Sequence, residues 1–107
     1  MITRKERSME LYKTVGAEVM LLKALENRLI TDMSKVVLAN DIDKMMCAFN
    51  KMEQVRSNAE DHMFHDYPEL SNDYIHVFYG NSSSDLNSSV NDEIKRIAKE
   101  IADGLIR

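Results

Sequence analysis

Four apolar residues recur at seven-residue spacing near the start of the chain. They are Val15, Leu22, Leu29 and Val36, and they lie in an uninterrupted helical pattern from about Ser8 to Ala39. At about 100° per residue these four fall within one narrow sector of a helix, so the segment presents a single apolar stripe. With their apolar neighbours they span an arc of roughly 140°, which suits a helix packed against two others. Something must therefore cover this stripe, and at least two more helical stretches of the chain can do so.

A second amphipathic helix is predicted from about Ile42 to His65, after a turn near residue 40. Asp41 is expected to cap it, because its carboxylate can accept hydrogen bonds from the free amides of the first turn. Pro68 is expected to end it, since proline disfavours the α conformation in the preceding residue. The apolar residues on its predicted inner side are Ile42, Met45, Met46, Phe49, Met52, Val55, Ala59, Met63 and Phe64.

The stretch from Pro68 to Tyr79 has two interpretations. Its apolar residues have helical spacing, but the run from Tyr74 to Tyr79 is rich in residues that favour strands. A lone strand would lack a partner, so we favour a short helix that ends at Gly80. The small polar residues that follow, to about residue 89, predict a mobile loop.

A third long helix is predicted to begin at Ser89. Ser89 and Asp92 have the spacing of a capping box, and acidic residues suit the positive end of a helix dipole. The apolar stripe of this helix consists of Val90, Ile94, Ile97, Ile101 and Leu105.

These elements predict an all-α fold, in which residues 1–107 form a single domain. Only three glycines and one proline occur among 107 residues, which favours helices over a sheet with many tight turns. We expect a small bundle of three long helices plus a short fourth. Short connections make neighbouring helices mostly antiparallel.

The charge of the chain argues against two classes of partner. A formal net charge of −4, with both signs interspersed, gives no general attraction to nucleic acid or to a membrane surface. Arg4, Lys5 and Arg7 form the one basic cluster near the N-terminus, which we interpret as a solvated end. The single cysteine, Cys47, cannot form an internal disulfide, and no signal peptide or membrane span is recognisable. We therefore expect a cytoplasmic protein.

One group of residues has ligand types that suit a divalent metal. Asp61, His62, His65 and Asp66 would share one side of the second helix. That side points away from the apolar stripe and should be solvated, and the chain lacks the Glu-x-x-His pairs of di-iron bundles. We favour an exposed polar surface over a metal site, and we expect no cofactor and no catalytic residue.

Charged residues within the apolar sides leave two alternatives open. Glu18 and Glu26 fall in the apolar arc of the first helix, and Glu53, Arg56 and Glu60 lie on or beside that of the second. Burial of unpaired charges is costly, so these residues must pair or lie at an edge. They form either a local ion network or a polar register within a helix–helix interface.

Five of the seven aromatic residues are close together in the sequence: Phe64, Tyr67, Tyr74, Phe78 and Tyr79. Tyrosine and phenylalanine are enriched in protein interfaces, which favours a contact surface. The equally weighted alternative is an aromatic cap on the end of the core.

The functional prediction is a non-enzymatic protein–protein interaction module that acts through amphipathic helix faces, with a homodimer as one form. The predicted contact residues are Leu22, Leu29, Tyr67, Tyr74, Phe78 and Tyr79. The first alternative is a DNA-binding regulator, although the stretch from Pro68 to Gly80 has no lysine or arginine to contact DNA. The second is a metal-dependent enzyme that uses Asp61, His62, His65 and Asp66.

Overall fold

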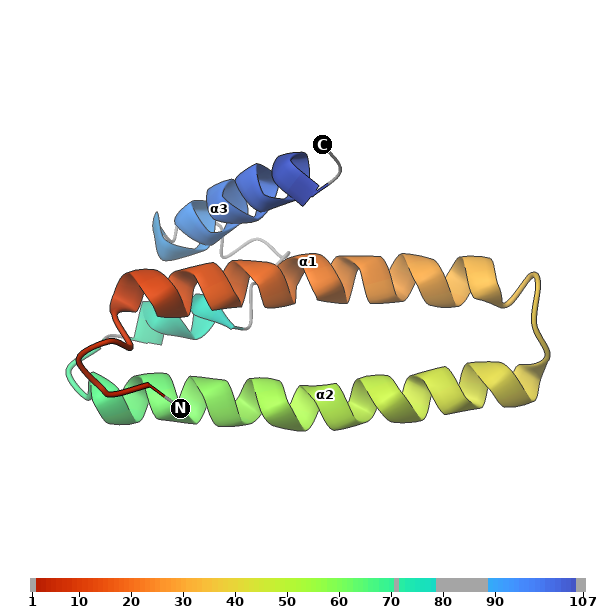
Figure 1. The fold of residues 1–107 in the computed structure, drawn as a ribbon, viewed down its shortest axis with the longest axis horizontal. Coiled ribbons are helices and arrows are strands. Elements are labelled where there is room, and N and C mark those ends of the chain that lie inside the picture. Colours follow the sequence, from red (N-terminus) through yellow and green to blue (C-terminus); the bar gives the residue numbers. More distant parts are fainter. Residues whose placement is uncertain (1, 71, 79–88, 106–107) are drawn as a thin grey trace.

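The computed structural model describes residues 2–70, 72–78 and 89–105, which form four helical elements and no strand (Figure 1). These are α1 (Met9–Met33), α2 (Ala39–Asp66), the 3₁₀ helix η1 (Asn72–Val77) and α3 (Ser89–Leu105). The predicted all-helical class is confirmed for this part of the chain.

The long helix α1 lies between α2 and α3 in one layer (Figure 1). The α2 helix returns alongside α1, so that Tyr12 meets Asp66 and Lys23 meets Glu53. The short helix η1 packs against α1 and α3. At this contact the backbone of Val77 lies directly against Gly16, where a Cβ atom would overlap the Val77 carbonyl oxygen.

The first helix begins as expected and ends early. The Ser8 side chain accepts a hydrogen bond from the Leu11 amide, which caps the helix start. The helix ends at Met33, six residues before the predicted end at Ala39, and the amides of Lys35 and Val36 then bond to carbonyls three residues back. Val36 therefore lies in the connecting turn, outside the helical stripe.

The start of α2 also differs from the prediction. The helix begins at Ala39, and its N-cap residue Leu38 provides no side-chain hydrogen bond. Asp41 lies inside the first turn, where its charge faces the positive end of the helix dipole but does not cap it. The predicted end is confirmed, because α2 stops at Asp66, two residues before Pro68.

The segment after Pro68 is helical but shorter than predicted. It forms a six-residue 3₁₀ helix instead of an α-helix that reaches Tyr79. The backbone contact with Gly16 places η1 closer to α1 than side-chain packing between two α-helices would allow. Tyr79, Gly80 and the predicted polar loop lie outside the described residues.

The hydrophobic core occupies one end of the molecule, which we call the packed end. Its eight buried apolar residues come from all four elements and the residue after η1: Tyr12, Ala17, Met63, Val77, Phe78, Val90, Ile94 and Ala98. In α3 the predicted stripe is buried at Val90 and Ile94 and half-buried at Ile97 and Ile101, whereas Leu105 is 72% exposed. The helix starts at Ser89 itself, and the side chain of this residue lies outside the described part.

Residues 22–56 form the opposite end, which we call the two-helix end because α1 and α2 build it, and α3 reaches only its border at Leu22 and Leu25. The sole buried residue there is Glu26, at 5% exposure. Val15, Leu22 and Leu29 are 36%, 39% and 40% exposed, and Val36 is 74% exposed. The other helices therefore cover the first stripe only in part. The radius of gyration, 15.5 Å, exceeds the value of about 13 Å for a compact domain of this length.

Candidate interaction surface

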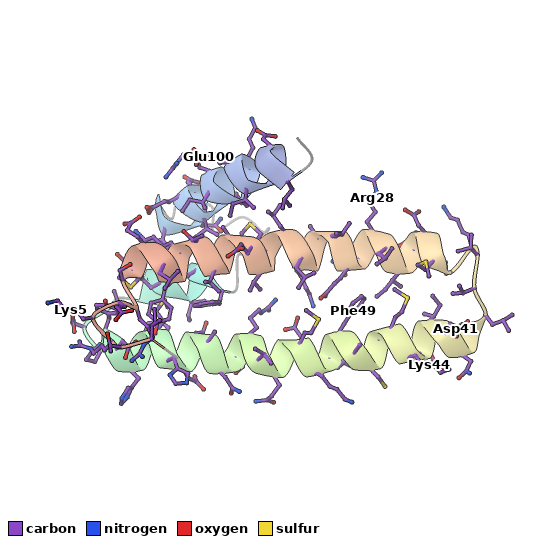
Figure 2. All side chains as sticks on the ribbon, in the orientation of Figure 1. Lys5, Arg28, Asp41, Lys44, Phe49 and Glu100 are labelled. Carbon is purple, nitrogen blue, oxygen red and sulfur yellow. The ribbon has the colours of Figure 1, made fainter. Side chains whose placement is uncertain are left out.

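One side of α1 is apolar and open to solvent. Its exposed apolar residues are Leu11, Val15, Leu22, Leu25 and Leu29, which we call the bare face. The opposite side of the same segment carries polar residues that include Asn27 and Arg28, and Figure 2 shows Arg28 directed away from α2. On α2, Phe49 lies on the side that faces α1 (Figure 2). The helix therefore uses one apolar sector for α2 and leaves a second sector uncovered.

A groove separates the bare face from α2. It has a volume of about 220 Å³, and it is lined by Val15, Val19, Leu22, Lys23, Glu26, Met52, Glu53, Val55, Arg56 and Ala59. Most of these side chains are apolar, and the charged ones come from both helices. The groove could hold apolar side chains of a partner, and the charged residues in its lining could orient that partner.

A second groove separates the bare face from α3. Its volume is about 210 Å³, and its lining consists of Glu18, Leu21, Leu22, Leu25, Ile101 and Leu105. A third hollow of about 280 Å³ extends the face toward the N-terminal segment, where it is lined by residues that include Ile2, Leu11 and Val15. Leu22 lines both long grooves, so it occupies the centre of the surface.

The charged residues in the first groove form an ion network that joins the two helices. Lys23 Nζ lies 2.6 Å from Glu53 Oε1, and Arg56 Nη2 lies 3.3 Å from Glu53 Oε2. The local network predicted around Arg56 is confirmed for its pair with Glu53. Partial burial and the neighbouring charge of Asp61 raise the pKa of Glu60. Of the two glutamates predicted in the apolar arc of α1, Glu18 is exposed and Glu26 is buried.

The structure does not bring the candidate metal ligands together. Asp61, His62 and His65 are exposed, as expected, but Asp66 is turned into the protein and is only 1% exposed. Within the described residues no group of three or more histidine, cysteine or acidic side chains could hold a metal ion. The prediction that Asp66 lies on a solvated surface is wrong, because it binds residues of the N-terminal segment and of α1.

Asp66 is the centre of a buried hydrogen-bond network. Arg7 donates to both carboxylate oxygens, from Nε to Oδ2 at 2.7 Å and from Nη2 to Oδ1 at 3.0 Å. Tyr12 Oη donates to Oδ2 at 2.5 Å. These bonds hold the pKa of Asp66 well below its usual range, with Arg7 as the largest cause. Burial and the bond to Asp66 raise the pKa of Tyr12 to about 12.

The same network fixes the residues that precede α1. Arg4 Nε donates to the Asp66 carbonyl oxygen at 2.9 Å, and the Arg4 guanidinium lies 5.5 Å from the centre of the Tyr67 ring. Tyr67 Oη donates to the Arg7 carbonyl oxygen at 2.9 Å. The basic cluster is therefore not a solvated end at Arg7, which is half-buried, whereas Arg4 and Lys5 are exposed. Cations at this position also suit the negative end of the α2 dipole.

Several residues of the aromatic cluster belong to the core of the packed end or lie against it. Tyr12 meets the rings of Tyr67 and Phe78 edge to face, each at 6.3 Å between centres. Phe78 is 2% exposed, and Phe64, Tyr67 and Tyr74 pack partly buried against the core. This is the geometry that the core-cap alternative describes. The role of Tyr67, Tyr74, Phe78 and Tyr79 as partner contacts stays a prediction, and Tyr79 lies outside the described residues.

Sequence reasoning missed two features that shape the surface. Arg7 and Asp66 are 59 residues apart, and neither lies in a recognisable motif, so no spacing rule pairs them. Gly16 gives a weak signal, because a glycine within a helix is costly and often marks a close backbone contact. The Cys47 side chain is exposed.

Two further findings concern the whole chain. Over the described residues, the helices lack the combination of length and apolar composition that a membrane span requires. No protein family, curated protein or solved structure matches the chain.

Proposed function

We propose that this protein is a non-enzymatic interaction module that binds another protein surface through the bare face of α1. The observation that carries the proposal is the row of exposed apolar residues from Leu11 to Leu29, flanked by an apolar groove on each side. A continuous row of exposed apolar side chains along most of a long helix is unusual on the surface of a monomer, and such surfaces mark interaction sites.

The length of the face favours a protein over a small molecule as its ligand. From Leu11 to Leu29 a helix rises about 27 Å. Partner helices that lie in apolar grooves place anchors at every third or fourth residue, which is the spacing between Leu22, Leu25 and Leu29. The face therefore fits an elongated apolar partner.

The proposal depends on Leu22 and Leu29 more than on the aromatic cluster. Both leucines are exposed and lie on the bare face, whereas Phe78 is buried in the core. In this proposal the chain is a mostly antiparallel bundle, with η1 as its short fourth helix. The pairing of Tyr12 with Asp66 and of Lys23 with Glu53 supports that arrangement. The single cysteine supports a cytoplasmic location.

An affinity capture experiment tests this function. The wild-type chain, Leu22→Glu and the control Asn27→Glu would each be immobilised and exposed to an extract of the native host, and retained proteins would be identified by mass spectrometry. We expect the wild type and Asn27→Glu to retain the same partner and Leu22→Glu to lose it. Asn27 is a suitable control because it lies on the polar side of the same helix segment.

Circular dichroism must show that both variants keep the wild-type helix content. The candidate partner would then be purified and its binding measured directly. Equal retention by all three forms would refute the bare face as the binding surface.

A further inference from the structure

We propose that the occupant of the bare face is a second copy of this chain. This inference rests on the proposed function, because it names the partner of the same surface. In the dimer the two α1 helices run in opposite directions about a two-fold axis near residue 20. Each packed end then covers part of the two-helix end of the partner subunit.

The exposed area of the chain is large enough for such an interface. The chain exposes 7584 Å², whereas a compact monomer of 12.3 kDa exposes about 6,100 Å². A standard protein interface buries about 800 Å² on each partner. The surplus, about 1,500 Å² by the same scaling, exceeds what one such interface requires.

The spacing of the bare face matches a second copy of itself. Together with Glu18, its members alternate by four and three residues: Leu11, Val15, Glu18, Leu22, Leu25 and Leu29. All six are exposed. Two helices interdigitate over several turns when both seams have the same seven-residue repeat, and a second α1 meets this condition by identity. A two-fold interface requires such a self-complementary patch.

Glu18 favours the antiparallel direction. A parallel pair in register would place the two Glu18 carboxylates opposite each other within an apolar seam, where like charges are unfavourable. In the antiparallel arrangement Leu11 faces the partner's Leu29, Val15 faces the partner's Leu25, and Glu18 faces the partner's Leu22. The opposed helix dipoles add to this preference.

The arrangement also accounts for the uneven core. Leu29 belongs to the two-helix end, which has no buried apolar residue of its own. Its predicted contact, the partner's Leu11, belongs to the first turn of α1 at the packed end. The dimer would therefore bury the apolar residues that the monomer leaves exposed.

Sedimentation equilibrium of the full chain tests the dimer. We expect the wild type to dimerise with a dissociation constant in the micromolar range, which is usual for modest interfaces. Leu29→Glu should weaken dimerisation at least ten-fold, whereas Asn27→Glu should change it by less than about two-fold. Circular dichroism on both variants shows whether the fold is retained.

Disulfide trapping tests the direction of the helices. In a Cys47→Ser background, which removes the exposed native thiol, Leu11→Cys and Leu29→Cys chains would be mixed in a glutathione redox buffer. Random pairing already makes the mixed disulfide more abundant than either disulfide between identical chains, so the antiparallel dimer predicts that the mixed disulfide exceeds the sum of the other two. An excess of disulfides between two Leu29→Cys chains would overturn the proposed direction.

Two outcomes separate this inference from the proposed function. A wild-type chain that remains monomeric at about 100 µM overturns the dimer, because a micromolar dimer would be populated there. If that monomer still captures a different protein in a manner that depends on Leu22, the interaction function stands with another partner. If it captures none, both proposals fail. Dimerisation that survives Leu29→Glu overturns the bare face as the interface.

Discussion

The packed end and the two-helix end contain the same kind of amphipathic helix but differ in what covers it. At the packed end, η1 and α3 join α1 and α2, and apolar residues from all four elements are buried. At the two-helix end α1 pairs with α2, α3 reaches only the border at Leu22 and Leu25, and Leu22 and Leu29 remain about 40% exposed. The apolar pattern of a helix therefore predicts that one of its sides packs against other residues. It does not predict whether those residues belong to the same chain or to a partner.

The ion pairs of the two ends also differ in how far they are buried. At the packed end Asp66 is buried and accepts three side-chain hydrogen bonds, two from Arg7 and one from Tyr12. At the two-helix end the side chains of Lys23 and Glu53 are 44% and 34% exposed. Exposed ion pairs contribute little to stability, so this pair cannot replace the missing core.

The largest expected effect comes from truncation of matched apolar residues at the two ends. Ile94→Ala should lower the free energy of unfolding by about 3 kcal/mol, because Ile94 is fully buried. Leu29→Ala should lower it by less than about 1 kcal/mol, since this side chain is partly solvated in the monomer. Urea denaturation at low micromolar protein measures both, and equal losses would remove the distinction between the ends.

The second effect comes from the two described glycines of the helices. Gly16→Ala should destabilise the packed end by about 2 kcal/mol, because the new methyl group would overlap the Val77 carbonyl and force η1 away. Gly104→Ala is the matched control: nothing lies within 4 Å of the point that its new methyl group would occupy, so it should be neutral or stabilising by up to about 1 kcal/mol. Thermal unfolding compares the two, and a Gly16→Ala chain as stable as the wild type would contradict the close contact.

The third effect is the pH-dependent stability that Asp66 provides. Because its pKa in the folded state lies below the unfolded value of about 3.9, the carboxylate stabilises the fold above that pH. This contribution should disappear progressively as the pH falls below about 4. The difference in unfolding free energy between wild type and Asp66→Asn should thus be constant from pH 6 to 8 and should shrink at pH 3. If the two chains differed in unfolding free energy by the same amount at pH 3 and pH 7, ionisation of Asp66 would not be the source of the stabilisation.

The smallest effect is expected at the two-helix end. Val55 is 67% exposed in the groove beside α1, so Val55→Lys should change the unfolding free energy by less than about 0.5 kcal/mol at low protein concentration. Urea denaturation at several concentrations checks this. A larger loss in dilute solution would mean that the monomer covers this side chain.

Helix periodicity was sufficient to predict the long elements, but not the contacts between them. The end of α2 near Pro68 and the buried residues Val90 and Ile94 follow from rules that act over a few residues. The end of α1 at Met33 is a choice that propensity alone does not resolve, because the apolar spacing continues past it to Val36. The pairing of Arg7 with Asp66 depends on how the hairpin closes, which no local pattern encodes.

The candidate surface shows the same limit. The sequence places Leu22 and Leu29 on one stripe, and their exposure appears only when η1 and α3 are seen to pack on other sides of α1. The four candidate metal ligands failed for a related reason. Helical spacing puts Asp66 beside His62 and His65, but a long-range partner turns its side chain into the protein.

Hydrogen exchange in the native state most directly tests the difference between the two ends. Measured at low micromolar protein, amides near Met63 in α2 and Ile94 in α3 should exchange only through global unfolding, because they lie in the core. Amides of residues 24–32 and 42–54 should exchange faster through local opening of the two-helix end. Equal protection of both sets of amides would contradict the account, because it would show that α1 and α2 are as firmly held without a core as with one.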